Sequence, residues 1–367
     1  MMVSVLIPYY NDREYLSQAI ESVLNQTYKD FELILINHAT TDDCREIAHS
    51  YNDKRIKHID MEENYGAGGG MIISKFLENA KGKYVKLFCA DDVMYPNCLE
   101  NLVNYMEKHP EKDFIFGNVE YIDENNKPTG ENWFKNRAGF SIENDEAGCL
   151  LTYFKGCSIL PYIGSFCKKE LFSTIKIDKT SIMTLDMSIW VLFLIKDYKI
   201  DYFNELVAGY RIHENQMSSS KQKKIAYQRC EFEFKNFMNI FFEFENIELA
   251  RKVFKNNPIL KHPNLTKEDL KFAIAFEILI HPSSWFRQSG YIYIYNCLND
   301  DKKRNYLKEK FNFGIKEFRQ IYSKGAESLF QPAQTLSLSQ IGYIFIKKLL
   351  FKITFRDYFK NKKLKAL

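Results

Sequence analysis

The chain has 367 residues, enough for two domains of ordinary size, since a domain typically spans about 100–200 residues. Hydrophobic residues make up 46% of the chain, which excludes an intrinsically disordered protein. The net charge of +4 at pH 7 lies too close to balance to indicate a nucleic-acid-binding protein, so we expect no nucleic-acid partner.

The cysteines and the N-terminal sequence indicate a cellular compartment. Eight cysteines are scattered along the chain without a CxxC pair or histidines at zinc-site spacing, which is typical of free thiols in a reducing environment. The sequence starts without the basic residues and long apolar stretch of a signal peptide. Its longest clean apolar run, residues 189–195, is far shorter than the roughly 18 residues that span a bilayer. We therefore expect a cytoplasmic protein that does not span the membrane.

The first half of the chain alternates short β-rich runs with helical patterns. The β-branched run Val3–Ile7 predicts a strand, and apolar residues at helical spacing after Asp12, a candidate N-cap, predict a helix. Further strands are expected at Phe31–Ile36, Ile56–Ile59, Tyr84–Phe88 and Phe114–Asp123, with helices at about 41–49, 70–80 and 96–106. This alternation predicts an α/β domain with a mainly parallel sheet covered by helices on both faces.

Three polar segments follow the predicted strands, namely Pro8–Asn11, Asn37–His38 and Asp91–Asp92. Ligands bind such sheets where the carboxyl ends of the strands open into a crevice, so we expect the segments to meet at one edge. Adjacent carboxylates repel each other unless a cation neutralises them. Asp91–Asp92 therefore indicates either a Mg²⁺ or Mn²⁺ site completed by substrate phosphate oxygens, or an acidic pair favoured by the helix dipole before Pro96.

The composition changes near residue 218. Helical patterns at 221–256 and 266–280 predict an all-helical second domain, residues 218–340, after a first domain of residues 1–217. In residues 341–367, eight basic residues face Asp357 alone and flank an apolar stripe at helical spacing. This pattern predicts a basic amphipathic tail helix. The helix either makes peripheral contact with an anionic membrane, which we favour, or docks on the helical domain with its basic face in solvent.

A series of motifs along residues 2–217 resembles one known family in order and spacing. The motifs are the opening 3–11, the run 16–28, Asp30–Ile34, Asn64-x-Gly66, Ala80–Tyr84, Ala90–Asp92, Leu185-Asp186 with Trp190, and Tyr210–His213. On these residues the chain resembles the inverting family 2 glycosyltransferases of bacterial capsule and lipooligosaccharide synthesis. The resemblance implies the GT-A fold, a Rossmann-like architecture.

The resemblance also implies a role for each matching residue. Asp186 falls where the family has its general base, and Asp92 and His213 where a divalent cation, Mn²⁺ or Mg²⁺, is held. The residues implied to bind the nucleotide sugar are Pro8, Tyr9, Tyr10, Asn11, His38, Asp91 and Arg211. Taken alone, Asp186 is better explained as a helix cap, Tyr9 or Tyr10 as a core aromatic and His213 as an ordinary satisfied histidine.

Two departures from the family pattern concern the donor site. Asn37-His38 replaces the usual acidic pair, so His38 or Asn37 is expected to accept the hydrogen bond from the base that a carboxylate accepts elsewhere. Met71 stands where the family often has an arginine that contacts phosphate. Backbone N–H groups at Gly68–Gly70 could bind the anion instead, or these glycines serve only a tight turn.

The sequence thus predicts a metal-dependent hexosyl- or N-acetylhexosaminyltransferase. We expect it to use a UDP-sugar and a hydroxyl of a cell-surface glycan, free or lipid-linked, as acceptor, at the inner face of the cytoplasmic membrane. The helical domain sets acceptor choice or assembles a homo-oligomer. Two alternatives stay open: a degenerate domain that only binds glycans or partners, favoured by Asn37-His38 and Met71, and a sugar nucleotidyltransferase, which lacks support because Pro8–Asp12 is no glycine-rich basic loop.

Overall fold

The computed structural model describes residues 2–66, 69–137, 140–141, 143–214, 216 and 232–324. By its contacts the chain divides into two compact units, Met1–Pro263 and Asn264–Leu367. Residues 232–263 belong to the first unit, whereas the domain limits 1–217 and 218–340 came from composition and stay predictions. The basic tail, residues 341–367, lies outside the described residues.

The first unit is built on a single sheet. Within the described residues the sheet has nine strands: eight follow the order β3-β2-β1-β4-β8-β6-β9-β5, and the ninth, β7, pairs with β6. The four predicted strands β1 (Val3–Tyr9), β2 (Phe31–Asn37), β3 (Ile56–Asp60) and β4 (Tyr84–Leu87) run parallel. Because helices cover both faces, β1, β2 and β4 are buried almost along their length and are mainly apolar.

The other half of the sheet is mixed. β8 (Ser165–Lys168) runs antiparallel to β4 and to β6 (Phe114–Ile122), and β9 (Ile200–Arg211) runs parallel to β6. Two further antiparallel strands are β5 (Val93–Met94), on β9, and β7 (Pro128–Asn132), on β6. The sequence pattern predicted β6, at Phe114–Asp123, but not β5, β7, β8 and β9, which are short or partly polar and lack a clear alternation. The predicted Rossmann-like α/β architecture is confirmed, with antiparallel strands added at one side.

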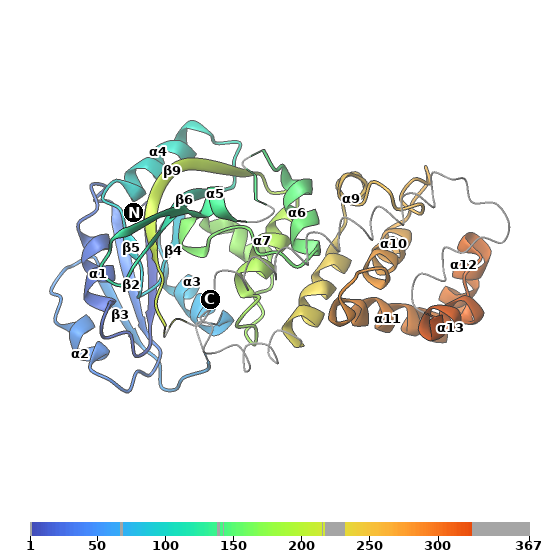
Figure 1. Ribbon diagram of the computed structural model, residues 1–367, viewed down its shortest axis with the longest axis horizontal. Coiled ribbons are helices and arrows are strands. Elements are labelled where there is room, and N and C mark those ends of the chain that lie inside the picture. The colour runs from blue at the N-terminus through green and yellow to red at the C-terminus, as the bar shows by residue number, and fades with distance from the viewer. Residues whose placement is uncertain are drawn as a thin grey trace. The chain divides into compact units, whose positions relative to one another are not determined.

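Helices lie on both sides of the sheet (Figure 1). α1 (Leu16–Leu24), α2 (Cys44–His49) and α4 (Cys98–Lys108) contribute apolar residues to one core cluster, which also contains residues of β1 and β2. α3 (Gly70–Asn79) and α7 (Leu185–Ile195) lie on the other side (Figure 1), where Trp190 packs on Phe114 and Phe116. The remaining elements up to residue 195 are α5 (Trp133–Asn136), α6 (Glu146–Phe154), η1 (Tyr162–Gly164) and η2 (Lys169–Thr174).

The C-terminal segments are helical where the structure describes them. Residues 232–239 are helical and continue into η4 (Ile240–Glu243) and α9 (Ile247–Val253), so the helix predicted at 221–256 is interrupted within its described part. The second unit contains α10 (Lys267–Leu279), α11 (Ser284–Asn299), α12 (Asp301–Phe311) and α13 (Ile315–Lys324). α10 matches the helix predicted at 266–280 and starts with a capping box between Thr266 and Asp269. Among the described helices, none has the length and apolar character to cross a membrane.

Candidate active site

The three predicted polar segments lie at the carboxyl ends of β1, β2 and β4. In the sheet β1 lies between β2 and β4, so the strand order reverses there, which is where open α/β sheets form their ligand crevice. Asn11 and Ala39 follow β1 and β2 with φ of 55° and 54°, a left-handed conformation that is uncommon for residues other than glycine. Backbone strain of this kind clusters at functional sites.

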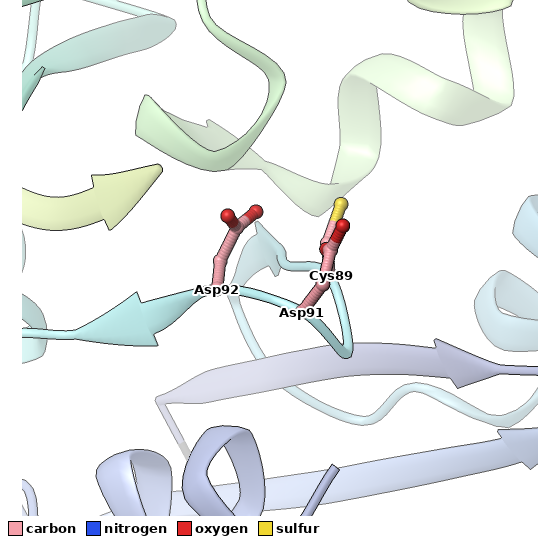
Figure 2. A group of neighbouring side chains, drawn as sticks. All are labelled: Cys89, Asp91 and Asp92. Carbon is pink, nitrogen blue, oxygen red and sulfur yellow. The ribbon is translucent and has the colours of Figure 1, made fainter. Parts of the chain in front are cut away.

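A group of potential metal ligands follows β4. Potential ligand atoms of Cys89, Asp91 and Asp92 all lie within 4.8 Å of one another, and their side chains project to the same side of the loop (Figure 2). Asp92 is 1% exposed; its Oδ1 accepts the Arg211 backbone N–H at 2.9 Å, and its buried Oδ2 has no hydrogen-bond partner among the described residues. Burial, and then the nearby Asp91, raise the pKa of Asp92 well above its usual value.

This arrangement suits a hard divalent cation. A buried carboxylate oxygen without a donor, beside a second carboxylate, is the environment that an oxygen-seeking cation would complete. Cys89 was not singled out from the sequence, because a lone cysteine carries no motif. Burial raises the pKa of its thiol, so the neutral sulfur is a poor ligand for Mg²⁺ or Mn²⁺.

His213 joins this group from the end of β9. Its Nε2 lies 3.1 Å from Asp91 Oδ2, and this hydrogen bond raises the pKa of His213. The edge of its ring contacts Tyr15, with ring centroids 5.0 Å apart. The structure therefore brings together Asp91, Asp92 and His213, as the sequence predicted, while metal binding itself stays a prediction.

Arg211 occupies a different position from the one expected. It is fully buried and stacks on the Tyr15 ring, with the guanidinium carbon 4.4 Å from the centroid. Its five N–H groups donate to the Asp91, Asp123 and Glu124 carbonyls and to the side-chain oxygens of Gln18 and Asn126. With all five donors engaged, Arg211 has none left for a diphosphate, and the geometry favours a framework role behind Asp91 and Asp92.

The segment after β1 divides between core and surface. Tyr9 is 2% exposed and belongs to the core cluster, the alternative that the sequence left open, whereas the neighbouring Tyr10 is 42% exposed at the crevice. Asn11 Oδ1 accepts the Thr41 N–H and the Thr40 hydroxyl, both at 2.9 Å. Asn11 thus joins the loops after β1 and β2, and Pro8 lies within β1.

His38 is oriented by a backbone contact. It is 2% exposed, and its Nε2 accepts the Tyr65 N–H at 2.9 Å. Burial lowers its pKa, so the ring is neutral, and because Nε2 accepts a hydrogen bond its proton resides on Nδ1. Asn37 is engaged at both ends of its amide, by the Thr40 N–H and by Asp60. We expected a hydrogen-bond acceptor for the base; His38 offers a donor.

Asp12 is a further carboxylate at this edge that sequence reasoning assigned only to a helix cap. Its Oδ2 accepts the Tyr10 N–H at 2.9 Å, and α1 begins four residues later without a side-chain cap. Burial, with a smaller contribution from the nearby Asp91, raises the pKa of Asp12 to about 6. The only signal in the sequence that Asp12 lies at this edge of the sheet is its position directly after Tyr10-Asn11.

Asp186 lies in the first turn of α7. Its Oδ1 accepts the Met187 N–H at 2.7 Å, and burial raises its pKa to about 6. The Asp186 charge also raises the pKa of Tyr162, which burial has already raised, and Cys89 acts on the same tyrosine. Asp186 and the loop after β4 are therefore both within electrostatic reach of Tyr162. A partly buried aspartate with a raised pKa is better suited to take a proton than an ordinary surface aspartate.

The glycines before α3 have a packing role. A Cβ at Gly70 would lie 2.1 Å from the Asp178 carbonyl oxygen, and one at Gly69 would lie 2.9 Å from that of Ser181. No side chain fits at either position without a shift of backbone. This close approach favours the structural explanation of the two glycines over an anion site; Gly68 lies outside the described residues.

The chain is similar to several known proteins. The family described as glycosyl transferase family 2 matches residues 4–163. An uncharacterized glycosyltransferase of Methanocaldococcus jannaschii is 32% identical over 242 residues, which cover 64% of this chain and 80% of the archaeal protein. An Escherichia coli protein named UDP-Glc:alpha-D-GlcNAc-diphosphoundecaprenol beta-1,3-glucosyltransferase WfgD is 28% identical over 231 residues, 62% of this chain and 83% of that protein.

A solved structure supports the same fold. The Staphylococcus aureus protein TarS, residues 1–349 in complex with UDP-GlcNAc, superimposes with a TM-score of 0.52 at 16% identity, over 90% of this chain and 89% of that one. This likeness confirms the predicted GT-A fold. The family match and the archaeal relative lead to one conclusion: the chain belongs to glycosyltransferase family 2, the enzymes of which transfer a sugar residue to an acceptor.

Proposed function

We propose that this glycosyltransferase inverts configuration and moves a sugar from a UDP-sugar to a hydroxyl of a glycan. The observation that carries the proposal is the buried Asp92 carboxylate, whose Oδ2 lacks a partner among the described residues beside Asp91 and His213. Such a site would be completed by a cation and a diphosphate. Asp186, with its pKa raised to about 6, supplies the base.

In the proposed reaction Asp186 accepts the proton of the acceptor hydroxyl while that oxygen attacks the anomeric carbon. The bond from the anomeric carbon to the diphosphate oxygen breaks, and its electron pair leaves with the nucleotide. A single displacement inverts the configuration, so an α-linked donor gives a β-linked product. A pKa near 6 leaves about nine-tenths of Asp186 ionised at pH 7 while making it more basic than a solvent-exposed aspartate.

The leaving diphosphate would be stabilised at the other end of the site. Asp91, Asp92 and His213 would hold a divalent cation, Mn²⁺ or Mg²⁺, with His213 neutral. When bound, the cation supplies positive charge where the diphosphate leaves. Arg211 would act by fixing the two aspartates. Its guanidinium donates to the backbone carbonyl of Asp91, and its backbone N–H donates to the Asp92 carboxylate.

The sugar donor is inferred from the residues that would bind the nucleobase, Tyr10 and His38, and the acceptor is inferred from a relative. A donor at His38 Nδ1 suits a carbonyl oxygen of uracil, and exposed Tyr10 suits stacking on the base. The E. coli relative is named for transfer from UDP-Glc to a lipid diphosphate sugar. We therefore propose a hexosyl- or N-acetylhexosaminyltransferase of capsule or lipooligosaccharide synthesis that acts on a lipid-linked glycan, with residues 341–367 at the membrane surface.

Replacing Asp186 by Asn tests the mechanism. We expect Asp186→Asn to lower transfer about 1,000-fold or more, because it removes the base, while UDP affinity measured by calorimetry stays within about twofold. In the unmodified enzyme, kcat should fall as the pH drops below about 6, since protonated Asp186 cannot act. Unchanged turnover in Asp186→Asn would remove this residue from the mechanism.

The same assay separates the alternative of a binding module. With Mn²⁺ present, an enzyme slowly hydrolyses or transfers its nucleotide sugar, which chromatography of the nucleotide detects. A chain that binds glycans but never releases UDP from any donor would favour the binding module.

A further inference from the structure

A buried glutamate outside the motif-bearing region contacts the turn that precedes α7. Glu233, in the helical residues 232–239, is 6% exposed. Its Oε2 accepts the Met183 N–H at 2.7 Å and the Thr184 N–H at 2.9 Å, and also the hydroxyls of Ser181 and Thr184 at 3.2 and 3.3 Å. A buried carboxylate is costly unless hydrogen bonds satisfy it, and four donors on one oxygen make this a specific contact.

This contact fixes the helix end that carries Asp186. Thr184 is the N-cap residue of α7, yet its side chain caps no N–H of the helix and turns to Glu233 instead. Asp186 is the second residue of α7, and its carboxylate bonds the next N–H along the same turn. Glu233, from the helical residues 232–239, therefore supplies the negative group that stabilises a helix N-terminus. It contacts Thr184, two residues before Asp186.

The same turn is confined on a second side. Gly69 and Gly70, at the start of α3, approach the carbonyl oxygens of Ser181 and Asp178 too closely to admit a Cβ. Residues 178–184 thus pack against the glycine turn and hydrogen-bond to Glu233. Close packing of backbone holds the glycine side, whereas Glu233 is the polar anchor of the Asp186 side.

We propose that Glu233 is a positioning residue for glycosyl transfer: it holds the start of α7 so that the Asp186 carboxylate meets the acceptor hydroxyl. The inference rests on the proposed role of Asp186 as the base. In the described part of the chain, the hydrogen bonds of Glu233 reach residues 181–184 alone, so its loss would leave the loops after β1, β2 and β4 in place. Misplacing a reacting group by about 1 Å can cost about 100-fold in rate.

The test is Glu233→Gln in the full chain. A neutral amide oxygen accepts these four hydrogen bonds more weakly than the charged carboxylate oxygen does, so we expect kcat to fall about 10- to 100-fold while the UDP dissociation constant stays within about twofold. The loosened turn admits water to Asp186, so the acidic limb of the pH–rate profile should move to lower pH. A purely structural role would not shift this limb.

Hydrogen exchange provides a readout that does not depend on activity. We expect the amides of Met183 and Thr184, protected in the wild type, to exchange faster in Glu233→Gln when followed by mass spectrometry. The matched control is Glu248→Gln on α9, whose 73% exposed carboxylate pairs with Arg251 at the surface. The control should leave exchange at 183–184, kcat and the pH profile unchanged.

The possible failures point to different conclusions. A wild-type chain that binds no nucleotide would contradict the proposed function. A normal kcat and an unmoved acidic limb in Glu233→Gln, with exchange accelerated at 183–184, would overturn the positioning role alone. If Glu233→Gln does not fold, Thr184→Val removes one of the four donors at constant shape; it should lower kcat in the same direction, and an unchanged kcat would overturn the inference.

Discussion

The two ends of the proposed donor site are built in opposite ways. The carboxylate end, residues 89–92 and 211–213, gathers acidic groups and leaves Asp92 Oδ2 buried without a partner in the described structure. The base end, residues 8–11, 37–41 and 65, pairs its polar groups with one another, as Asn11 does with Thr40 and Thr41. The carboxylate end is therefore electrostatically incomplete within the described structure, because a buried carboxylate oxygen is left without a donor, whereas the polar groups of the base end are already hydrogen-bonded to one another.

This difference separates what the two ends would contribute. An incomplete group of buried carboxylates is stabilised by whatever brings positive charge, so the carboxylate end would couple cation binding to the chemistry. A preassembled loop loses little entropy when a ligand binds, and few of its atoms remain open for recognition. At the base end these are the exposed ring of Tyr10 and Nδ1 of His38.

The largest expected effect is that of Asp92→Asn at the carboxylate end. We expect transfer to fall about 1,000-fold, because the site loses a charged ligand, and the rise in melting temperature on adding Mn²⁺ with UDP to disappear. Without metal the variant should be more stable than the wild type by about 1 kcal/mol, because a buried charge beside Asp91 is removed. Activity assays and thermal shift measure both changes.

A surface substitution controls for the loss of one negative charge. Asp301→Asn, in the helical unit, removes a carboxylate that is 83% exposed and pairs with Arg304. It should change neither transfer nor the response to Mn²⁺. If Asp92→Asn retained the metal-dependent stabilisation, the carboxylate end would not be the cation site.

Arg211→Lys should have the next largest effect, and on stability rather than on nucleotide affinity. Lysine can replace few of the five hydrogen bonds and leaves several acceptors of the turn at 123–126 without a donor. We expect a loss of about 3 kcal/mol in the free energy of unfolding, measured with urea, and a UDP dissociation constant within about threefold at low temperature. A stable variant with greatly weakened UDP binding would instead support the direct diphosphate contact expected from the sequence.

The contrast between the ends also explains which parts could be predicted from the sequence. Apolar runs ended by polar residues located β1, β2 and β4, and the parallel order then placed Asp91-Asp92 at the crevice. The role of Arg211 could not be read in this way, because its acceptors are carbonyls of a turn some 85 residues away in sequence. The contact of Glu233 could not be predicted for the same reason, since no local pattern links it to residues 181–184, about 50 residues earlier.

His38 shows a finer form of the same problem. Its type and its position after β2 were evident, but the location of its proton depends on a backbone N–H at Tyr65, 27 residues later. The sequence predicted an acceptor for the base because an imidazole nitrogen can accept. In the structure the Tyr65 N–H occupies the acceptor nitrogen, Nε2, so that only the N–H donor at Nδ1 is left for a ligand.

The smallest expected effect tests this tautomer with two variants of His38. Gln can extend its side-chain oxygen to where Nε2 accepts the Tyr65 N–H, but it offers no donor at the Nδ1 position; Asn can place its amide N–H near Nδ1 and loses the Tyr65 contact. If Nδ1–H reads the base, His38→Gln should weaken UDP binding about tenfold, the value of one hydrogen bond, and His38→Asn should weaken it less.

Calorimetry with UDP and with an abasic ribose diphosphate measures the effect of each variant. The abasic ligand should bind both variants as it binds the wild type, because the loss at His38→Gln concerns a contact to the base. The opposite order, with His38→Asn weaker than His38→Gln for UDP, would mean that the Tyr65 contact matters through loop order and that the base is read elsewhere. In that case the base end would not be preassembled for recognition of the nucleobase. Like the carboxylate end, it would reach its final arrangement only when the ligand binds.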